Sequence, residues 1–553
     1  MLNENLIESF SANIRKHWDV AAYSDYRGQT ISSKDVAHRI MQLHTIFTEA
    51  GVERGDKVAV IGRNSAHWAV TYWATVTYGA VIVPVLPDFT AEEIHHIVGH
   101  SDAVLLFVSD PIYDKLDDSR MKDLKGIVRL EDFSLRYHQQ KGLDEVFEQS
   151  GQRYLEQHAA RLTAEGFGFP EVPGTDLATI VYTSGTTGFS KGVMLNHHSL
   201  ICNARYYIDS LDLERNRRVV SFLPLAHCYG CAFDLIAPSI GGGHVTFIDK
   251  MPTPKVLMGA FAEIRPVVVL SVPLIIEKIF KSRIKPQLES KALKAMMKVP
   301  AVNRLIYKKI RRKISMVFGG EFQEVVIGGA AFAKEADAFF RKIDFPLANG
   351  YGMTECGPLI SYSVVADNPP LGCVGRVIPY LECKIDITDP TNGVGEVLVR
   401  GENVMLGYYK DEEATREAID PDGWLHTGDM GHMDQDGFLF LTGRSKNMIL
   451  SASGQNVYPE EIEAKLNNLP YVSESLIMDC NAKICALIHP DMDRADEDGL
   501  TEAQLEAIME KNRQELNKVV PSYASIVRVK VLYEEFEKTP TKKIKRRLYN
   551  VFQ

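Results

Sequence analysis

The sequence predicts an α/β protein with a large N-terminal domain and a small α+β C-terminal domain. Three observations lead to this prediction: a length of 553 residues, short apolar runs that alternate with helical patterns, and glycine-punctuated strands after about residue 370. A single hydrophobic core stops growing near roughly 250–300 residues, so this chain needs at least two cores. We expect a large domain over residues 1–444, barrel-like from about residue 370, and a small domain over residues 445–553.

The pattern of the first part of the chain predicts parallel-type sheets with crossover helices. Residues 57–61 (KVAVI) form an apolar run, residues 66–78 fit a helix, and residues 80–85 (AVIVPV) form the next run. Strands of the same kind are expected at residues 103–108, 178–181, 267–270 and 324–327. Short β-rich runs that alternate with helical segments are typical of parallel sheets.

The sequence pattern changes twice in the later part of the chain, at about residue 370 and at Ser445. Glycines separate the expected strands 383–387, 395–400 and 437–442, which favours an antiparallel or barrel-like subdomain. From Ser445 onward the pattern indicates a smaller α+β unit. Its clearest helix, residues 459–466 (PEEIEAKL), begins with proline and acidic residues, which suit the start of a helix.

Composition and charge exclude several classes of protein. Hydrophobic residues make up 45% and charged residues 24% of the chain, close to the averages for soluble globular proteins. The formal net charge is −10, so we expect no nucleic-acid partner, which would require a broad basic surface. The longest apolar stretches, residues 267–276 and 75–86, fall short of the ~20 residues of a spanning helix. With no signal-peptide pattern and no disulfide framework among eight cysteines, a cytoplasmic protein is expected.

One segment departs from this charge balance. Thirteen basic residues lie between Lys278 and Lys313, with Glu289 as the single acid and with Leu305 and Ile306 among the interleaved apolar residues. This segment is either a solvated helical face or a surface for an anionic membrane or an acidic acyl carrier protein. If the segment is a surface for an anionic membrane, we expect the protein to make a peripheral contact with the inner face of the membrane.

Residues 182–193 (YTSGTTGFSKGV) carry the strongest chemical signal. They follow the expected strand 178–181, and their hydroxyl side chains and three glycines indicate a loop with many exposed N–H groups. Such a loop can wrap around anionic oxygens, and Lys191 adds a positive charge. The string differs from the Walker A pattern because Ser190 precedes Lys191 and Gly192 follows it.

Further strings follow along the chain. They are residues 349–355 (NGYGMTE), 423–429 (GWLHTGD), 454–463 (GQNVYPEEIE) and 539–546 (TPTKKIKR). In order and spacing these strings resemble the motifs of the adenylate-forming enzymes, which include acyl-CoA synthetases, luciferases and the adenylation domains of peptide synthetases. The resemblance runs from about residue 178 to the end, and residues 221–227 (SFLPLAH) are similar to the bacterial long-chain fatty acid–CoA ligases.

The resemblance implies a ligase that uses Mg²⁺, ATP and CoA. A fatty acid and ATP would give acyl-AMP and pyrophosphate, and CoA would then displace AMP to give acyl-CoA. The first step is needed because a carboxylate has no good leaving group, whereas an acyl-AMP loses AMP readily. An anion must attack an anionic triphosphate, so positive groups and oriented dipoles are the main catalytic requirement.

The resemblance also implies which residues bind the phosphates. The β- and γ-phosphates of ATP would lie against Thr183, Ser184, Gly185, Thr186, Thr187, Gly188 and Lys191. Thr354 would contact the α-phosphate, and Glu355 would hold Mg²⁺. Both are therefore implied catalytic residues as well.

For the nucleoside, Tyr351 would stack on adenine, because a π-face suits a planar base. Asp429 would accept hydrogen bonds from both ribose hydroxyls, with assistance from Arg444. Gly328, Gly329 and Ala330 follow the expected strand 324–327, and small residues there would let a ligand approach closely. The remaining ATP-site residues implied by the motif at 349–355 are Asn349, Gly350 and Gly352.

Two more catalytic residues are implied. Lys543 would bridge the attacking carboxylate and the α-phosphate, stabilising charge in the transition state. Here the sequence departs from the family pattern, because Lys542 stands where glycine is usual. His227 is either a core histidine or a neighbour of the reacting carboxylate, and the sequence leaves both open. The family rotates its small domain between the two steps, and Lys446 matches the hinge position.

The prediction is therefore a long-chain fatty acid–CoA ligase. One alternative passes the acyl group to the phosphopantetheine of a carrier protein, which the basic segment would suit. A luciferase-like monooxygenase shares the same motifs. A nucleotide-binding regulator without turnover is the alternative from another class, and the complete set of motifs argues against it.

Overall fold

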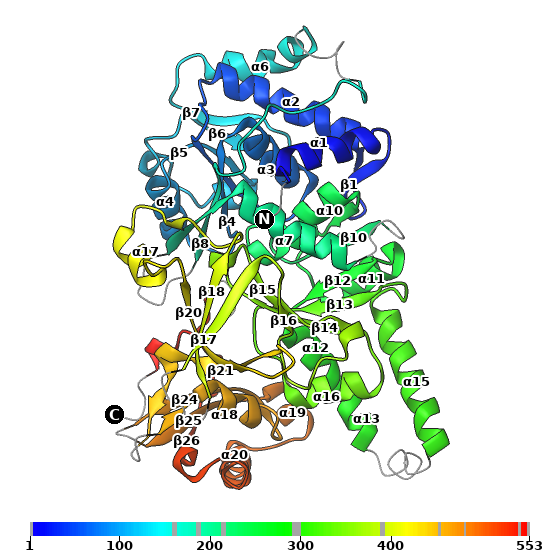
Figure 1. The fold of residues 1–553 in the computed structure, drawn as a ribbon, viewed down its shortest axis with the longest axis vertical. Coiled ribbons are helices and arrows are strands. Elements are labelled where there is room, and N and C mark those ends of the chain that lie inside the picture. The colour runs from blue at the N-terminus through cyan, green and yellow to red at the C-terminus, as the bar shows by residue number, and fades with distance from the viewer. Residues whose placement is uncertain are drawn as a thin grey trace.

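The predicted α/β class is confirmed, with mixed sheets covered by helices in the large N-terminal part and a smaller α+β unit after it (Figure 1). The computed structural model describes residues 4–156, 163–183, 190–211, 217–289, 300–387, 393–451, 455–480, 483–539 and 543–549. Elements are labelled as in Figure 1.

One half of the large part is an eight-stranded sheet in the order β19-β9-β8-β4-β3-β5-β6-β7. Its parallel centre consists of β8 (Leu177–Thr183), β4 (Val81–Val85), β3 (Lys57–Ile61), β5 (Ala103–Val108) and β6 (Gly126–Arg129). Its antiparallel edges are β19 (Gly407–Tyr408) with β9 (Lys191–Asn196), and β7 (Leu135–His138). The predicted strands at 57–61 and 103–108 have these bounds, because buried parallel strands read as continuous apolar runs.

Helices cover this sheet. The crossover helix α3 (Ala66–Tyr78) begins at the N-cap Ser65, ends at Gly79 with φ +85°, and buries Trp68 and Trp73 completely. The other helices of this half are α1 (Leu6–Lys16), α2 (Ser33–Glu49), α4 (Ala91–His100), α5 (Asp110–Tyr113), η1 (Asp118–Arg120) and α6 (Leu143–Tyr154).

The second half is a nine-stranded sheet in the order β16-β15-β14-β13-β12-β10-β11-β1-β2. Its strands are β16 (Arg376–Val377), β15 (Leu359–Tyr362), β14 (Leu347–Gly352), β13 (Glu324–Ile327), β12 (Val268–Ser271), β10 (Arg218–Ser221), β11 (His244–Phe247), β1 (Ala21–Asp25) and β2 (Thr30–Ser32). The strands from β14 to β1 are parallel, and the edges are antiparallel.

The helical segments between these strands include several short turns. They are α7 (His197–Ser210), α9 (Cys228–Gly230), η3 (Cys231–Ile236), α10 (Ala237–Gly241), α11 (Pro254–Ile264), α12 (Pro273–Ile279), η4 (Phe280–Ile284), α13 (Lys285–Glu289), α15 (Pro300–Val317), α16 (Lys334–Lys342), η5 (Thr354–Cys356) and η6 (Val365–Asp367).

The glycine-punctuated segment forms a four-stranded antiparallel sheet. It consists of β17 (Leu381–Asp386), β18 (Gly395–Gly401), β20 (Leu425–Met433) and β21 (Leu439–Arg444), and α17 (Glu412–Ala418) precedes β20. The strand predicted at 437–442 begins at Leu439, because Gly437 has φ +80° and closes a turn onto the carbonyl of Asp434.

The C-terminal unit has a hydrophobic cluster of its own, which includes Leu466, Ile488 and Met509. Its elements are η7 (Ser445–Asn447), β22 (Ile449–Leu450), β23 (Asn456–Val457), α18 (Pro459–Leu466), β24 (Val472–Asp479), β25 (Ile484–Pro490), α19 (Met492–Glu497), α20 (Glu502–Asn517), η8 (Ser522–Ala524), β26 (Ile526–Val531) and η9 (Arg546–Leu548). Among the described residues, every helix is too short or too polar to cross a membrane.

Candidate functional site

A β-hairpin fixes the two ends of the predicted phosphate loop. Thr183 ends β8 and Lys191 begins β9, and the two residues are direct partners in the antiparallel pairing. The Thr183 hydroxyl also donates a hydrogen bond to the Lys191 carbonyl oxygen at 3.5 Å. The predicted phosphate-binding residues between them, Ser184, Gly185, Thr186, Thr187 and Gly188, lie outside the described residues.

Tyr408 connects Lys191 with Glu355. Strand β19 pairs with β9, which places Tyr408 opposite Val193. The Lys191 ammonium lies 4.7 Å from the centre of the Tyr408 ring, a distance typical of a cation–π interaction. The Tyr408 hydroxyl donates to Glu355 Oε1 at 2.9 Å. Sequence analysis missed this residue, because a tyrosine after a glycine carries no chemical signal until the strand pairing is known.

Asp429 lies on β20 beside two residues that the sequence assigned to the nucleoside. Its partner in the strand pairing is Arg444 on β21, whose Nε lies 3.0 Å from Asp429 Oδ1. The Tyr351 hydroxyl, from β14, donates to Asp429 Oδ2 at 2.8 Å. Burial, followed by the charge of Asp429, raises the pKa of Tyr351, so the phenol remains a hydrogen-bond donor. Each oxygen of this buried carboxylate therefore has a defined donor.

A tight loop of the C-terminal unit carries Lys543. The amide of Thr539 donates to the Lys543 carbonyl at 2.8 Å, and the Lys543 amide donates to Thr539 Oγ1 at 3.2 Å. On one side of the loop Lys538 forms an ion pair with Glu474 at 2.8 Å. The neighbouring Lys542 lies outside the described residues.

On the other side of the loop, Arg546 holds the chain to the small core. Its guanidinium hydrogen-bonds the carboxylate of Glu463, which also accepts the Ile477 amide at 2.7 Å. Burial raises the pKa of Glu463, and the positive charge of Arg546 lowers it. This partly buried ion pair helps to fix the geometry, since losing Arg546 would leave the buried charge of Glu463 without its partner.

The Lys543 side chain is exposed, and it lies close enough to residues of the large part to interact with their charges. Its pKa is lowered by the surrounding protein and then by the positive charge of Arg444, while Asp429 and Glu355 act in the opposite direction. The pKa of His227 is lowered to about 4, first by burial and then by the positive charge of Lys543. The structure thus brings together predicted residues from four distant parts of the chain.

His227 caps the short helix α9 at the same region. Its Nδ1 accepts a hydrogen bond from the Tyr229 amide at 3.2 Å, so Nε2 is the nitrogen left for another partner. The Tyr229 hydroxyl donates to the Val326 carbonyl at 3.1 Å, which ties α9 to β13. Burial raises the pKa of the Cys228 thiol, and the neighbouring Thr354, the residue predicted to contact the α-phosphate, acts in the opposite direction.

The remaining ATP-site residues directly follow β13 or lie within β14: Gly328, Gly329 and Ala330 after β13, and Asn349, Gly350 and Gly352 in β14. Gly329 has φ +86° and is exposed together with Ala330. A Cβ at Gly352 would lie 1.9 Å from the carbonyl oxygen of Pro358, so glycine is required there. The Asn349 side chain donates to the Cys373 carbonyl at 3.4 Å.

A small apolar cavity lies behind the segment that carries His227. Its lining includes Tyr72, Leu195, Leu225, Ile236 and Gly357, and its volume is about 10 Å³. That volume corresponds to about one water molecule. Any larger apolar ligand therefore requires these side chains to move.

The predicted hinge residue, Lys446, lies in the short turn η7 between β21 and β22, and it is exposed. The adjacent Ser445 hydroxyl donates to the Gly428 carbonyl at 3.2 Å.

Comparisons with known proteins agree with this arrangement. The family model described as AMP-binding enzyme matches residues 10–409, and the model of the AMP-binding enzyme C-terminal domain matches residues 446–552. The chain is similar to the long-chain-fatty-acid–CoA ligase FadD15 of Mycobacterium bovis, with 30% identity over 94% of this chain and 90% of that protein. It is also similar to the long-chain-fatty-acid–CoA ligase ACSBG1 of Rattus norvegicus, with 28% identity over 80% of this chain and 64% of that protein.

Among solved structures, ATP-bound MatB from Rhodopseudomonas palustris has the same fold. Its TM-score is 0.77, with 21% identity and complete coverage of both chains. The family matches extend over both parts of the chain, and the similarity to FadD15 spans almost its whole length. The chain therefore belongs to the AMP-binding enzyme family, as the resemblance of its motifs predicted.

Proposed function

We propose that this protein is an AMP-forming long-chain fatty acid–CoA ligase. It converts a fatty acid and ATP to acyl-AMP and pyrophosphate, and then transfers the acyl group to CoA with release of AMP. The observation that best supports this proposal is the convergence of Lys543, His227, Glu355 and Asp429 on one region. The names of the relatives support the choice of substrate.

The charges at this region suit the first step. Lys191 binds the β- and γ-phosphates, and Lys543 stabilises the negative charge that develops between the carboxylate and the α-phosphate. Asp429 is held by Tyr351 and Arg444, so its oxygens are oriented to accept the ribose hydroxyls. Tyr351 then presents its ring to adenine.

Glu355 fits the role of a Mg²⁺ ligand. Its carboxylate is half-buried, and Tyr408 occupies Oε1, which leaves Oε2 for a cation. Mg²⁺ is usually held by one or two carboxylates together with substrate phosphates, and it would neutralise phosphate charge here. Thr354 lies next to Glu355 and contacts the α-phosphate.

His227 assists as a neutral hydrogen-bonding group near the substrate carboxylate. With a pKa of about 4, its ring carries no charge at neutral pH, so it adds no repulsion against Lys543. The apolar cavity behind it is the start of the acyl pocket, which opens when the fatty acid enters.

The second step requires a domain rotation about Lys446. We place the boundary between residues 444 and 445, because the unit that follows has its own hydrophobic cluster. With Lys543 beside Asp429 and Glu355, the described arrangement suits adenylation. Rotation would withdraw Lys543 and open the site to the thiol of CoA.

The basic helix α15 is proposed as a peripheral contact with an anionic membrane. It runs along one edge of the molecule (Figure 1), with Arg304, Lys308, Lys309, Arg311, Arg312 and Lys313 exposed. Leu305 and Met316 are exposed on the same helix, at 68% and 62%. Basic and apolar side chains on one helix suit a lipid surface. Residues 290–299 of the basic segment lie outside the described residues, and Lys281 and Lys285 are bonded within the protein.

Pyrophosphate release across carboxylic acids from acetate to oleate tests the proposed function, with Mg-ATP and with or without CoA. Long-chain acids should release pyrophosphate fastest, and acyl-CoA should form in proportion to AMP. Transfer to a holo carrier protein but not to CoA would favour the carrier-protein ligase instead. No pyrophosphate with any acid would favour the inactive regulator.

A further inference from the structure

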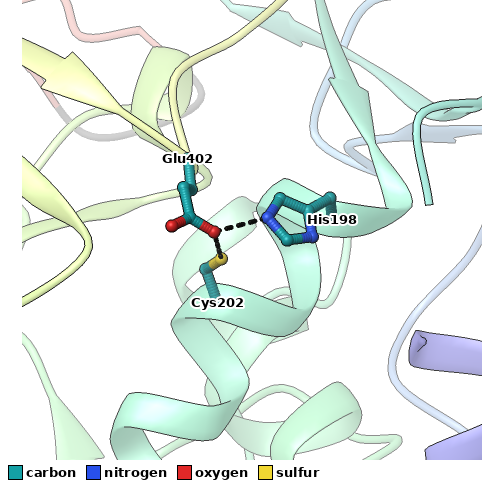
Figure 2. Close-up of side chains that lie close together, drawn as sticks. All are labelled: His198, Cys202 and Glu402. Carbon is teal, nitrogen blue, oxygen red and sulfur yellow. Dashed lines mark hydrogen bonds and ion pairs between the residues drawn. The ribbon is translucent and has the colours of Figure 1, made fainter. Parts of the chain in front are cut away.

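Three metal-binding side chains meet outside the proposed ATP site, between α7 and the end of β18 (Figure 2). His198 and Cys202 are four positions apart on α7, so they share one face of the helix. Glu402 directly follows β18 and points toward both of them. His198 Nε2 lies 2.5 Å from Glu402 Oε2, and Cys202 Sγ lies 3.8 Å from the same oxygen.

We propose that these three side chains form a Zn²⁺ site. All three ligand atoms lie within 4.8 Å of one another. Zn²⁺ bonds of about 2.0–2.3 Å in a tetrahedral site separate ligand atoms by about 3.3–3.8 Å. The ion therefore fits after His198 and Glu402 move apart by roughly 1 Å, so that the metal replaces the hydrogen bond between them.

The chemistry of the donors selects the metal. Imidazole and thiolate are borderline and soft ligands, which suit Zn²⁺, whereas Mg²⁺ and Ca²⁺ require oxygen ligands. On binding, the Cys202 thiol loses its proton to the solvent, and the proton shared by His198 Nε2 and Glu402 also leaves, so that Nε2 binds the ion and the neutral ring carries its one proton on Nδ1. Glu402 is already a carboxylate donor.

Burial leaves one side of the cluster open. Cys202 is completely buried, while the side chains of His198 and Glu402 are 26% and 18% exposed. This opening gives the ion a route in and allows a water molecule to be the fourth ligand.

The position of the cluster indicates what the ion would do. From α7, Asn203 donates to the Cys356 carbonyl at 3.2 Å and accepts the Leu359 amide at 2.8 Å. From the segment after Glu402, Asn403 donates to the Leu359 carbonyl at 2.7 Å. The next residues continue this contact, since the Met405 amide donates to the Glu355 carbonyl at 2.8 Å. An ion that joins α7 to Glu402 would therefore brace the two elements that hold the Glu355 loop.

Zinc titration of the chelator-treated full-length protein tests this proposal. We expect one Zn²⁺ per chain and a higher midpoint of thermal unfolding when Zn²⁺ is present. With Co²⁺ in place of Zn²⁺, a thiolate-to-cobalt charge-transfer band should appear in the near ultraviolet. The zinc stoichiometry, the unfolding midpoint and the cobalt band are all measured independently of ligase activity.

Matched variants separate a metal site from a hydrogen-bonded cluster. Cys202→Ser and His198→Gln should each weaken Zn²⁺ binding by at least about tenfold, and Cys202→Ser should abolish the cobalt band. Glu402→Gln should also weaken binding, although glutamine can still hydrogen-bond His198 and preserve the fold. Cys383→Ser, on β17, is the control and should bind Zn²⁺ like the wild type. Absence of Zn²⁺ binding to the wild type, or binding that survives Cys202→Ser, would overturn the proposal.

Discussion

Lys543 lies among charges of both signs, and its contribution to the reaction can be separated from that of the rest of the site. Desolvation by the surrounding protein and the positive charge of Arg444 lower the pKa of Lys543, while Asp429 and Glu355 favour its charged form. Replacing it by alanine should slow adenylation by about 10²–10³-fold, the usual cost of removing one transition-state donor. Thioester formation from supplied acyl-AMP should be nearly unchanged. Single-turnover assays of each half-reaction measure the two effects.

Lys545→Ala is the matched control for this variant, because Lys545 is two residues further on and lies 3.9 Å from Glu537. It should keep both half-reactions. Equal loss of both half-reactions in Lys543→Ala would contradict the proposed role.

At Tyr408, the contribution of the hydroxyl group to the site can be tested separately from the contribution of the ring. Tyr408→Phe keeps the ring beside Lys191 but removes the hydrogen bond to Glu355. We expect the KM for Mg-ATP to rise by about tenfold, since a hydrogen bond to a charged group contributes about 1.5–3 kcal/mol. Fatty acid affinity should stay constant. Initial rates at varied Mg-ATP test this, and an unchanged KM would remove Tyr408 from the site.

The sequence predicted the charged residues of the site better than their neighbours. Glu355, Asp429 and Lys191 each stand in a long string whose spacing carries the information. Tyr408 gains its position from a two-residue strand that pairs with β9, and such a short pairing has no periodic signal. The Arg546–Glu463 pair was also missed, because an ion pair between distant residues leaves no pattern in either segment.

At the scale of elements, the turn η7 is the point at which the proposed rotation must occur. Lys446→Pro would remove a backbone N–H and restrict φ near −65° in the turn. The thioester half-reaction should slow by at least about tenfold, with adenylation less affected, because the described arrangement already suits adenylation. Rapid-quench measurement of both half-reactions gives the ratio.

Lys446→Ala is the control for side-chain loss and should behave like the wild type. Circular dichroism of both variants excludes unfolding as the cause. Equal slowing of the two half-reactions in Lys446→Pro would count against rotation at this turn.

Helix α15 carries six exposed basic side chains of the basic segment: Arg304, Lys308, Lys309, Arg311, Arg312 and Lys313. Changing Lys308, Lys309, Arg311 and Arg312 together to glutamine should weaken binding to phosphatidylglycerol vesicles by at least about tenfold, since each basic residue contributes up to about 1 kcal/mol. Vesicle co-sedimentation at low and high salt measures the effect. The activity on detergent-dispersed fatty acid should remain, because α15 lies outside the proposed ATP site.

A variant with four substitutions elsewhere on the surface controls for net charge. In it the exposed residues Lys34, Lys115, Lys122 and Lys141 are changed to glutamine. This variant should bind vesicles like the wild type. Equal binding by all three proteins would identify α15 as an ordinary solvated face.

The elements that the sequence predicted best are those with continuous apolar runs. The strands at 57–61, 103–108 and 324–327 and the helix at 66–78 have the predicted bounds. In the antiparallel sheet, the strand predicted at 437–442 begins two residues later because Gly437 belongs to a turn, and the strand predicted at 383–387 begins two residues earlier. Sheet order could not be predicted, since it depends on contacts between distant segments.

At the scale of the whole molecule, both halves of the large part share one hydrophobic core, and three histidines of this part have lowered pKa values: His197, which is buried, and His67 and His227, which are half-buried. His197, the first residue of α7, is 1% exposed, and within the described part of the chain neither ring nitrogen has a hydrogen-bond partner. Burial, and then the positive charge of Arg54, lowers the pKa of His197 to about 4. The pKa values of His67 and His227 are lowered to about 4 as well.

These histidines make the folded state sensitive to acid. Because the pKa in the folded protein lies below the ordinary 6.5, the unfolded chain binds more protons between pH 6.5 and about 4. The contribution of these histidines to the free energy of unfolding is therefore fully present above pH 6.5 and is lost as the pH falls toward 4. For His197 alone this loss reaches up to roughly 3 kcal/mol. Urea unfolding at a series of pH values should show this slope for the wild type. His197→Leu should flatten it, while the exposed His138→Gln should not, and a slope in His197→Leu as steep as that of the wild type would contradict the assignment.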